Sequence, residues 1–170
     1  MERWRRIDQA PADEARDLLR MCCGAKRWVD AMMSLRPFGS STSVLHAARE
    51  EWLRLPPESW LEAFGHHPRI GDRAAMRAKF ASTRALSAQE QSGVDDSSDD
   101  VVNALVEANR RYEERFGFIF IVCASGKSAE EMLALIRSRM NNEPDVELRV
   151  AADEHAKICE LRLMGDVQKT

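Results

Sequence analysis

The sequence predicts an all-α fold, a single-domain multi-helix bundle over residues 1–170 with one short extended apolar segment. Its 170 residues are a usual size for one domain and suffice to bury one hydrophobic core. Apolar residues recur at helical spacing along most of the chain. Only residues 118–123 form a continuous run of β-prone residues, and the sequence contains neither an internal repeat nor a linker between domains.

The first half of the chain is expected to form short helices separated by prolines and glycines. Apolar side chains fall on one face in the predicted helices 12–21, 26–35, 43–55 and 58–65. The stretch 37–40, Pro-Phe-Gly-Ser, breaks the chain between the second and third of these. Pro56 and Pro57 end the third helix, because the residue before a proline disfavours helical backbone. Residues 66–72 are loop-like.

The second half is expected to contain the longest helices. They are predicted over residues 73–81, from Ser87 onward, and over 99–116, 128–140 and 145–164. Gly117 and Gly165 close two of them, since glycine readily takes the left-handed conformation that ends a helix. Ser128 with Glu131 three residues later predicts a capping box. The apolar run 118–123 is predicted to be a buried extended segment.

Composition and charge argue against several classes of protein. The net charge of −3 and pI near 5.9 argue against a nucleic-acid partner, because phosphate binding needs a basic face. No stretch is long and apolar enough to span a bilayer, and the basic residues 1–6 lack the apolar region of a signal peptide. The four cysteines include no C-x-x-C pair, so we expect no zinc ribbon but reduced thiols in a cytoplasmic protein.

Two segments carry polar residues suited to chemistry, and each has two interpretations. His66 and His67 precede a proline; histidine transfers protons near neutral pH, but a loop histidine can also simply face solvent. Ser87 and Glu90 have the spacing of a capping box, although the same helix N-terminus could bind a carboxylate. From the residues alone, the structural interpretation is favoured in both places.

Polar residues also interrupt two apolar helix faces. Asn109 shares a face with Leu105 and Tyr112, and Arg162 lies among leucines near the end of the last predicted helix. An arginine there could pair with a buried acid, extend to water or clamp an anionic ligand with its planar fork of donors. The structural interpretations are again favoured. His155 shares the face of Arg162 and is expected to be an ordinary, partly buried histidine.

Taken together and in order, these segments resemble the family of 2-oxo-4-hydroxy-4-carboxy-5-ureidoimidazoline (OHCU) decarboxylases. The resemblance spans about residues 60–164. The motifs that carry it are His67-Pro68-Arg69-Ile70-Gly71, Ser87-x-x-Glu90-Gln91 with Gly93, Asn109-x-x-Tyr112-x-x-Arg115-Phe116-Gly117-Phe118-x-Phe120, and Lys157-Ile158-Cys159-x-Leu161-Arg162-Leu163. Many relatives have a Leu-Ala-Gly or Leu-Gly type of sequence where this chain has residues 69–72, which leaves the roles of Arg69 and Asp72 open.

The resemblance implies an all-α homodimer that uses no metal and no organic cofactor. It also implies a set of site residues. The implied catalytic residues are His67 and Glu90, and the implied substrate-binding residues are Pro68, Ser87, Gln91, Phe120, Ile121, Val122, Cys123, Ala124 and Arg162. Contacts from the segment 120–124 are expected to come partly from backbone groups. The role of Asn109 stays open.

The reaction implied by the resemblance is decarboxylation of OHCU to (S)-allantoin and CO2 in urate degradation. The substrate carries an imine beside the carbon that loses CO2, so it supplies its own electron sink, which explains why no cofactor is needed. We expect His67, helped by Glu90, to act as general base toward the substrate hydroxyl. Arg162, the helix N-terminus at Ser87, and Gln91 are expected to hold the ring oxygens and the ureido group.

Two other functions could use parts of the same residue set. A metal-dependent hydrolase could use His66, His67, Asp72 and Glu90, but adjacent histidines rarely bind one metal and no H-x-x-x-H pair is present. A non-catalytic helical adaptor would need an exposed apolar groove and would leave the polar residues on apolar faces without a purpose.

Overall fold

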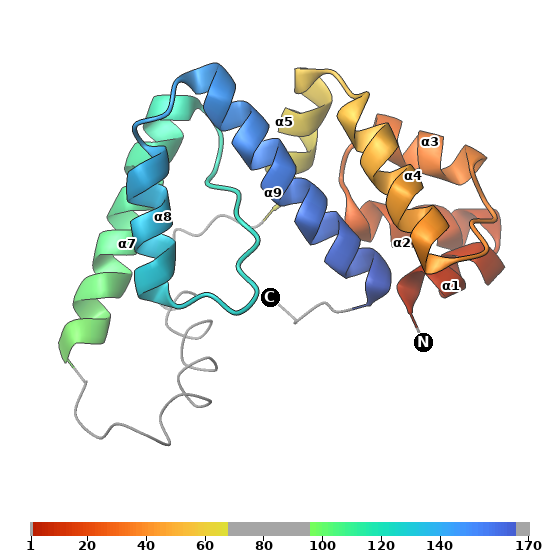
Figure 1. Cartoon of the computed structure of the whole chain (residues 1–170), viewed down its shortest axis with the longest axis horizontal. Helices are drawn as coiled ribbons and strands as arrows, with labels where there is room; N and C mark the ends of the chain where they lie inside the picture. The colour runs from red at the N-terminus through yellow and green to blue at the C-terminus, as the bar shows by residue number, and fades with distance from the viewer. Residues whose placement is uncertain (1, 68–95, 166–170) are drawn as a thin grey trace. The chain divides into compact units, whose positions relative to one another are not determined.

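The computed structural model describes residues 2–67 and 96–165, and these residues form helices and the loops that connect them (Figure 1). The helices are α1 (Arg3–Gln9), α2 (Ala12–Cys22), α3 (Lys26–Ser34), α4 (Ser41–Leu53), α5 (Pro57–Gly65), α7 (Asp96–Phe116), α8 (Ala129–Arg139) and α9 (Pro144–Met164). The described residues contain no strand, so the predicted all-α class is confirmed. The helices predicted over 73–81 and from Ser87 lie outside the described residues. Among those described, none is long and apolar enough to cross a membrane.

The chain divides into two compact units, which are described separately. Unit 1 consists of Met1–His67, Ile121–Cys123 and Leu148–Thr170, and unit 2 consists of Pro68–Phe120 and Ala124–Glu147. Helix α9 therefore begins in unit 2 and continues in unit 1. A single domain over residues 1–170 stays a prediction.

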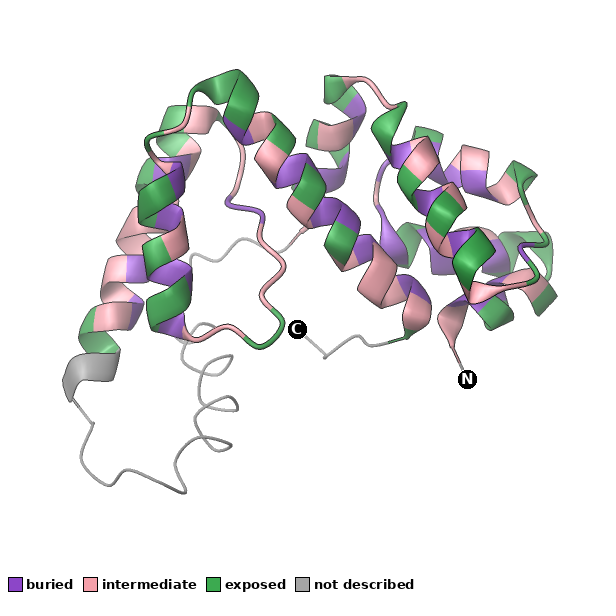
Figure 2. Cartoon of the chain, viewed as in Figure 1, coloured by how far each residue is buried: buried purple, intermediate pink, exposed green. Residues whose placement is uncertain are grey.

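The core of unit 1 is built around buried tryptophans. Trp28 on α3 and Trp52 on α4 are 0% and 2% exposed, so each indole N–H needs a protein acceptor. The Trp28 Nε1 donates to the Ala48 carbonyl at 3.0 Å, and the Trp52 Nε1 donates to the Ala152 carbonyl of α9 at 2.9 Å. These bonds fix α4 against α3 and α9. Figure 2 shows the pattern that accompanies this packing, with buried and exposed residues alternating around each helix.

The first helix of unit 1 was missed by the sequence analysis, which treated residues 1–6 only as a basic segment. Helix α1 buries Trp4 and Ile7, three residues apart on one face. Its Asp8 accepts hydrogen bonds from the backbone N–H groups of Phe38 and Gly39, each at 3.0 Å. The helix is only seven residues long and rich in arginine, so its apolar periodicity is too short to recognise in the sequence.

Unit 2 is held together by a buried polar cluster with side chains from α7, α8 and the start of α9. Glu147 is 0% exposed; Arg139 pairs with it at 2.5 Å, and Asn142 donates to it at 2.8 Å. The Tyr112 hydroxyl donates to the same carboxylate. Burial and the Glu147 carboxylate raise the pKa of Tyr112, so the phenol stays protonated. The cluster satisfies a buried acid that would otherwise be costly.

The predicted segment ends of unit 2 are confirmed. Gly117, with φ +77°, follows the last turn of α7, and Ser128 forms a capping box with Glu131 at the start of α8. The chain between these helices has no regular secondary structure at 119–124, and within the run 118–123 only Phe120 and Ile121 are buried, so the predicted burial holds for part of the run. Within it, Ile121–Cys123 belongs to unit 1, whereas Phe120 and Ala124 belong to unit 2.

Candidate active site

The predicted catalytic histidine lies just after α5, at the last described position before the gap. The His67 backbone N–H donates to the Phe64 carbonyl at 3.1 Å, which continues the helical turn through this residue. The two adjacent histidines differ in environment: His66 is exposed and His67 is half-buried. A Cβ atom at Gly24 would lie 2.4 Å from the His66 ring, so only glycine allows this approach of the chain.

His67 faces a second histidine that the sequence analysis undervalued. The rings of His67 and His155 are 5.0 Å apart between centroids and meet edge to face at 83°. His155 is 0% exposed, so the expectation of a partly buried histidine was wrong. Its other side stacks on Trp52, with ring centroids 4.5 Å apart and an angle of 17° between the planes. These aromatic contacts fix the surroundings of His67 in unit 1.

The electrostatics of this pair favour a neutral His155. Burial lowers the pKa of His155 well below its usual value of 6.5, and the nearby His67 and Arg162 lower that pKa further. His155 is therefore an uncharged aromatic neighbour at neutral pH. A protonated His67 is therefore not repelled by a second imidazolium.

Arg162 lies on α9 in the same unit, half-buried against the end of α2. Its Nη1 donates to the Cys22 carbonyl at 3.2 Å, and the Arg3 Nη1 donates to the Arg162 carbonyl at 2.8 Å. Cations suit these positions because the last carbonyls of a helix have no partner within it. Within the described residues, Nε and Nη2 of Arg162 have no hydrogen-bond partner, so these donors can bind a ligand.

Three residues of the extended segment also belong to unit 1. Ile121 is buried, while Val122 and Cys123 are half-buried. The Cys123 backbone N–H donates to Glu154 Oε2 on α9 at 2.8 Å, which ties the segment to the helix that carries His155 and Arg162. The structure thus gathers His67, Arg162 and residues 121–123 into one compact unit.

The remaining predicted site residues belong to unit 2 or lie outside the described residues. Phe120, which is buried, and Ala124 belong to unit 2. Pro68, Ser87, Glu90 and Gln91 lie outside the described residues, as do Arg69 and Asp72. Asn109, whose role was open, donates from Nδ2 to the Leu105 carbonyl one turn earlier in α7, at 2.9 Å. That bond within the helix explains how the amide is accommodated on an apolar face.

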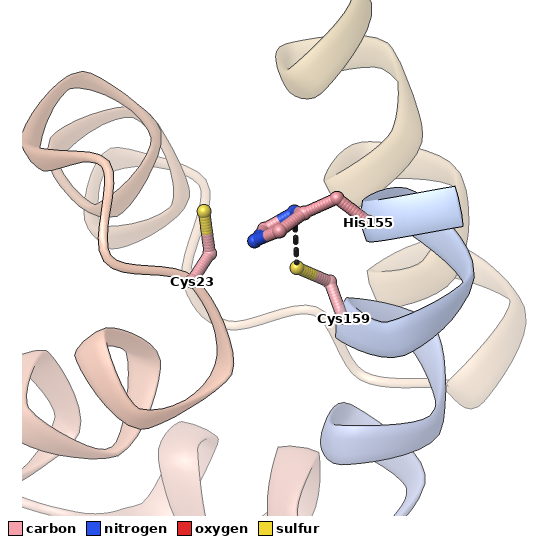
Figure 3. A group of neighbouring side chains, drawn as sticks. All are labelled: Cys23, His155 and Cys159. Atoms are coloured by element: carbon pink, nitrogen blue, oxygen red, sulfur yellow. Dashed lines mark hydrogen bonds between the residues drawn. The ribbon is translucent and has the colours of Figure 1, made fainter. Parts of the chain in front are cut away.

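One group of potential ligand atoms was missed altogether. Cys23 lies close to His155 and Cys159, all three buried, with one ligand atom of each within 4.8 Å of the others (Figure 3). The only signal in the sequence is the spacing of four residues between His155 and Cys159, which places both on one face of a helix. Nothing in the sequence indicates that Cys23 joins them.

A comparison with known families decides the assignment. A family model described as OHCU decarboxylase matches residues 8–164. The chain belongs to the OHCU decarboxylase family. The resemblance noted in the sequence is therefore confirmed, and with it the expectation of a decarboxylase of urate degradation.

Similar proteins agree with this family. The chain is 36% identical over 140 residues to the 2-oxo-4-hydroxy-4-carboxy-5-ureidoimidazoline decarboxylase of Amia calva, covering 81% of this chain and 78% of that protein. It is 35% identical over 148 residues to the uric acid degradation bifunctional protein TTL of Arabidopsis thaliana, covering 86% of this chain but 45% of that protein. The chain thus spans less than half of the second relative.

Two solved structures have a similar fold. One, described as an OHCU decarboxylase in the presence of (S)-allantoin, is 34% identical with a TM-score of 0.67, covering 85% of this chain and 92% of that one. Another, described as an (S)-allantoin synthase, has a TM-score of 0.69 at 17% identity, covering 96% of this chain and 54% of that one. At 17% identity the second shows the fold alone.

Proposed function

We propose that this chain converts OHCU to (S)-allantoin and CO2, with His67 as the residue that transfers the hydroxyl proton. The observation that carries the proposal is the placement of a half-buried His67 against a buried, uncharged His155, in the same unit as Arg162 and residues 121–123. Family membership supports the reaction, and a related structure described in the presence of (S)-allantoin supports the product.

The chemistry needs little more than orientation and proton transfer. The bond between the carboxylate and its ring carbon breaks, and its electron pair forms a double bond to the neighbouring carbon while the imine nitrogen takes up the displaced pair and a proton. The hydroxyl then loses its proton as it becomes a carbonyl, and the neighbouring carbon gains one. Delivery of this last proton to one face sets the configuration of the product.

His67 suits the removal of the hydroxyl proton. Because His155 is neutral, it does not repel the positive charge that forms on His67 during the reaction. We propose Glu90 as the residue that assists it, and Pro68, Ser87 and Gln91 as further contacts to the substrate.

Arg162 and the extended segment suit binding. The Nε and Nη2 donors of Arg162 lie on the edge of the guanidinium and can bind an oxygen of the anionic substrate. We propose that backbone groups of residues 120–124 contact the substrate as well. From the resemblance we further propose a homodimer located in the cytoplasm.

Turnover of freshly made substrate tests this function. The unstable intermediate is generated in the cuvette from urate with urate oxidase and hydroxyisourate hydrolase, and its decay is followed with and without the protein. The wild-type chain should accelerate the decay, and His67→Asn should lose about 10²- to 10⁴-fold of that acceleration, the usual contribution of a general base.

The neighbouring histidine provides the matched control. His66→Asn makes the same chemical change one residue away, at an exposed side chain, and should retain the wild-type rate. Both variants should keep the wild-type far-ultraviolet circular dichroism. Equal rates for His67→Asn and wild type would refute the role of His67, and no acceleration by the wild type would refute the function itself.

A further inference from the structure

A set of three buried metal-binding groups lies within unit 1. Cys23 follows the last residue of α2 in an extended conformation, with φ −145° and ψ 127°. His155 and Cys159 are one turn apart on α9, so their side chains leave the helix on one face. Figure 3 shows the three side chains pointing toward one another. Cys23 comes from the end of α2 and the other two residues come from α9, so an ion bound by all three would join these two helices.

The distances are close to those of a bound ion. One ligand atom from each residue lies within 4.8 Å of the others, and the His155 Nδ1 is 3.3 Å from the Cys159 Sγ. In a tetrahedral zinc site, bonds of about 2.0–2.3 Å place the ligand atoms about 3.5–3.8 Å apart. The pair on α9 therefore already has nearly the required separation. Cys23 supplies the third donor of the set.

We propose that Cys23, His155 and Cys159 bind a thiophilic divalent cation of the Zn²⁺ class. Two sulfurs and one imidazole nitrogen are a donor set that selects such ions over Mg²⁺ or Ca²⁺. Binding converts both thiols to thiolates and releases two protons, and water or a small anion takes the fourth position. The bound ion clamps the end of α2 to α9. This site adjoins the proposed active site, because His155 also contacts His67, but the proposed reaction does not require the ion.

The burial of the three side chains supports this assignment. Cys23 and His155 are 0% exposed and Cys159 is 4% exposed, so water competes little for the donor atoms. The Nδ1 of His155 faces the Cys159 Sγ at 3.3 Å and is the nitrogen placed to bind the ion, with the imidazole proton on Nε2.

Cobalt titration tests the proposal directly. Co²⁺ is added to the reduced full-length chain, and its absorption spectrum is recorded. We expect the near-ultraviolet charge-transfer band of cobalt bound to thiolate, saturating at one ion per chain and lost on addition of Zn²⁺. Cys23→Ser and Cys159→Ser should each weaken the band by about half or abolish it, since each removes one of the two thiolates of the site.

Cys22→Ser is the matched control. Cys22 is equally buried and adjacent to Cys23, but it lies outside the proposed ligand set. This variant should keep the full cobalt band, and Zn²⁺ should raise its melting temperature as it raises that of the wild type. No thiolate band in the wild type, or a band that survives in both ligand variants, would overturn the assignment.

A second measurement needs no substituted chain, in case a ligand variant does not fold. X-ray absorption of the wild-type protein with one equivalent of Zn²⁺ reports the ligand atoms around the metal. Two sulfurs with at least one histidine nitrogen are expected. A shell of nitrogen and oxygen only would refute the site. Neither measurement depends on turnover, so failure of the metal site and failure of the proposed decarboxylase activity are distinguishable.

Discussion

At the scale of single residues, the surroundings of His67 matter more than its position in a loop. The ring of the buried His155 stacks on Trp52 and meets the His67 ring in an edge-to-face arrangement. Since burial keeps His155 uncharged, the pair can accept one proton without bringing two positive charges together. His67 is thereby held beside a rigid aromatic group and is still only half-buried, as a residue that meets a substrate must be.

Arg162 should contribute to substrate binding through the shape of its guanidinium. Arg162→Lys keeps the charge but loses the planar fork, and a lost charge-assisted hydrogen bond costs about 1.5–3 kcal/mol. We therefore expect KM to rise by about tenfold or more. Steady-state kinetics on freshly generated substrate measure the change.

Arg49→Lys is the control for this substitution. Arg49 lies in the same unit on α4 and forms an exposed ion pair with Glu160 at 3.3 Å. Exposed pairs contribute little, so its KM should match that of the wild type. An Arg162→Lys variant with unchanged KM would contradict a role of Arg162 in substrate binding.

At the scale of helices, the start of α8 is set by local chemistry that is readable in the sequence. The Ser128 hydroxyl accepts the Glu131 N–H at 3.2 Å, and the Glu131 carboxylate accepts the Ser128 N–H at 2.7 Å. Ser128→Ala should lower the free energy of unfolding by about 1 kcal/mol. Urea denaturation measures it. Ser138→Ala, at an exposed position of the same helix, should change stability by less than about 0.5 kcal/mol.

The buried carboxylate of unit 2 should be far more important for stability. Glu147→Gln removes the negative charge that compensates the buried Arg139 guanidinium in this cluster, so we expect a loss of about 3–5 kcal/mol. Thermal and urea denaturation measure the loss. Glu143→Gln, an exposed change one turn earlier, should be nearly neutral. Similar stabilities for the two variants would contradict the role given to the cluster.

The sequence predicted most described helices because their amphipathic pattern and their stops are local. Prolines and glycines delimit α4, α7 and α9, and the predicted bounds differ from the observed ones by a few residues. Helix α1 was missed because two apolar residues in a short arginine-rich stretch give no clear period. Most helix bounds were predicted to within a few residues because they depend on residues that are close along the chain.

The site was less predictable, because its contacts join distant parts of the chain. His67 and Arg162 came from the family resemblance and not from periodicity. The contact between His67 and His155, and the approach of Cys23 to α9, arise only after the chain folds. A buried histidine on an apolar helix face looks the same in sequence whether it packs in the core or borders a site.

At the scale of the whole molecule, the chain carries the family's fold and its motifs over nearly its full length. The family model covers residues 8–164, and the related structure described with (S)-allantoin is matched over 92% of its own length. The comparison with the Arabidopsis protein, of which the chain covers 45%, shows that the matched region also occurs within a longer protein. We therefore expect this region alone to perform the decarboxylation.

The stereochemistry of the product tests that claim most directly. OHCU generated in the cuvette is allowed to react to completion with the purified chain, and circular dichroism of the resulting allantoin is recorded. Protonation on one face within a chiral site predicts the full signal of (S)-allantoin, appearing at the rate at which the intermediate disappears. Racemic allantoin formed at the rate of the uncatalysed reaction would contradict the account.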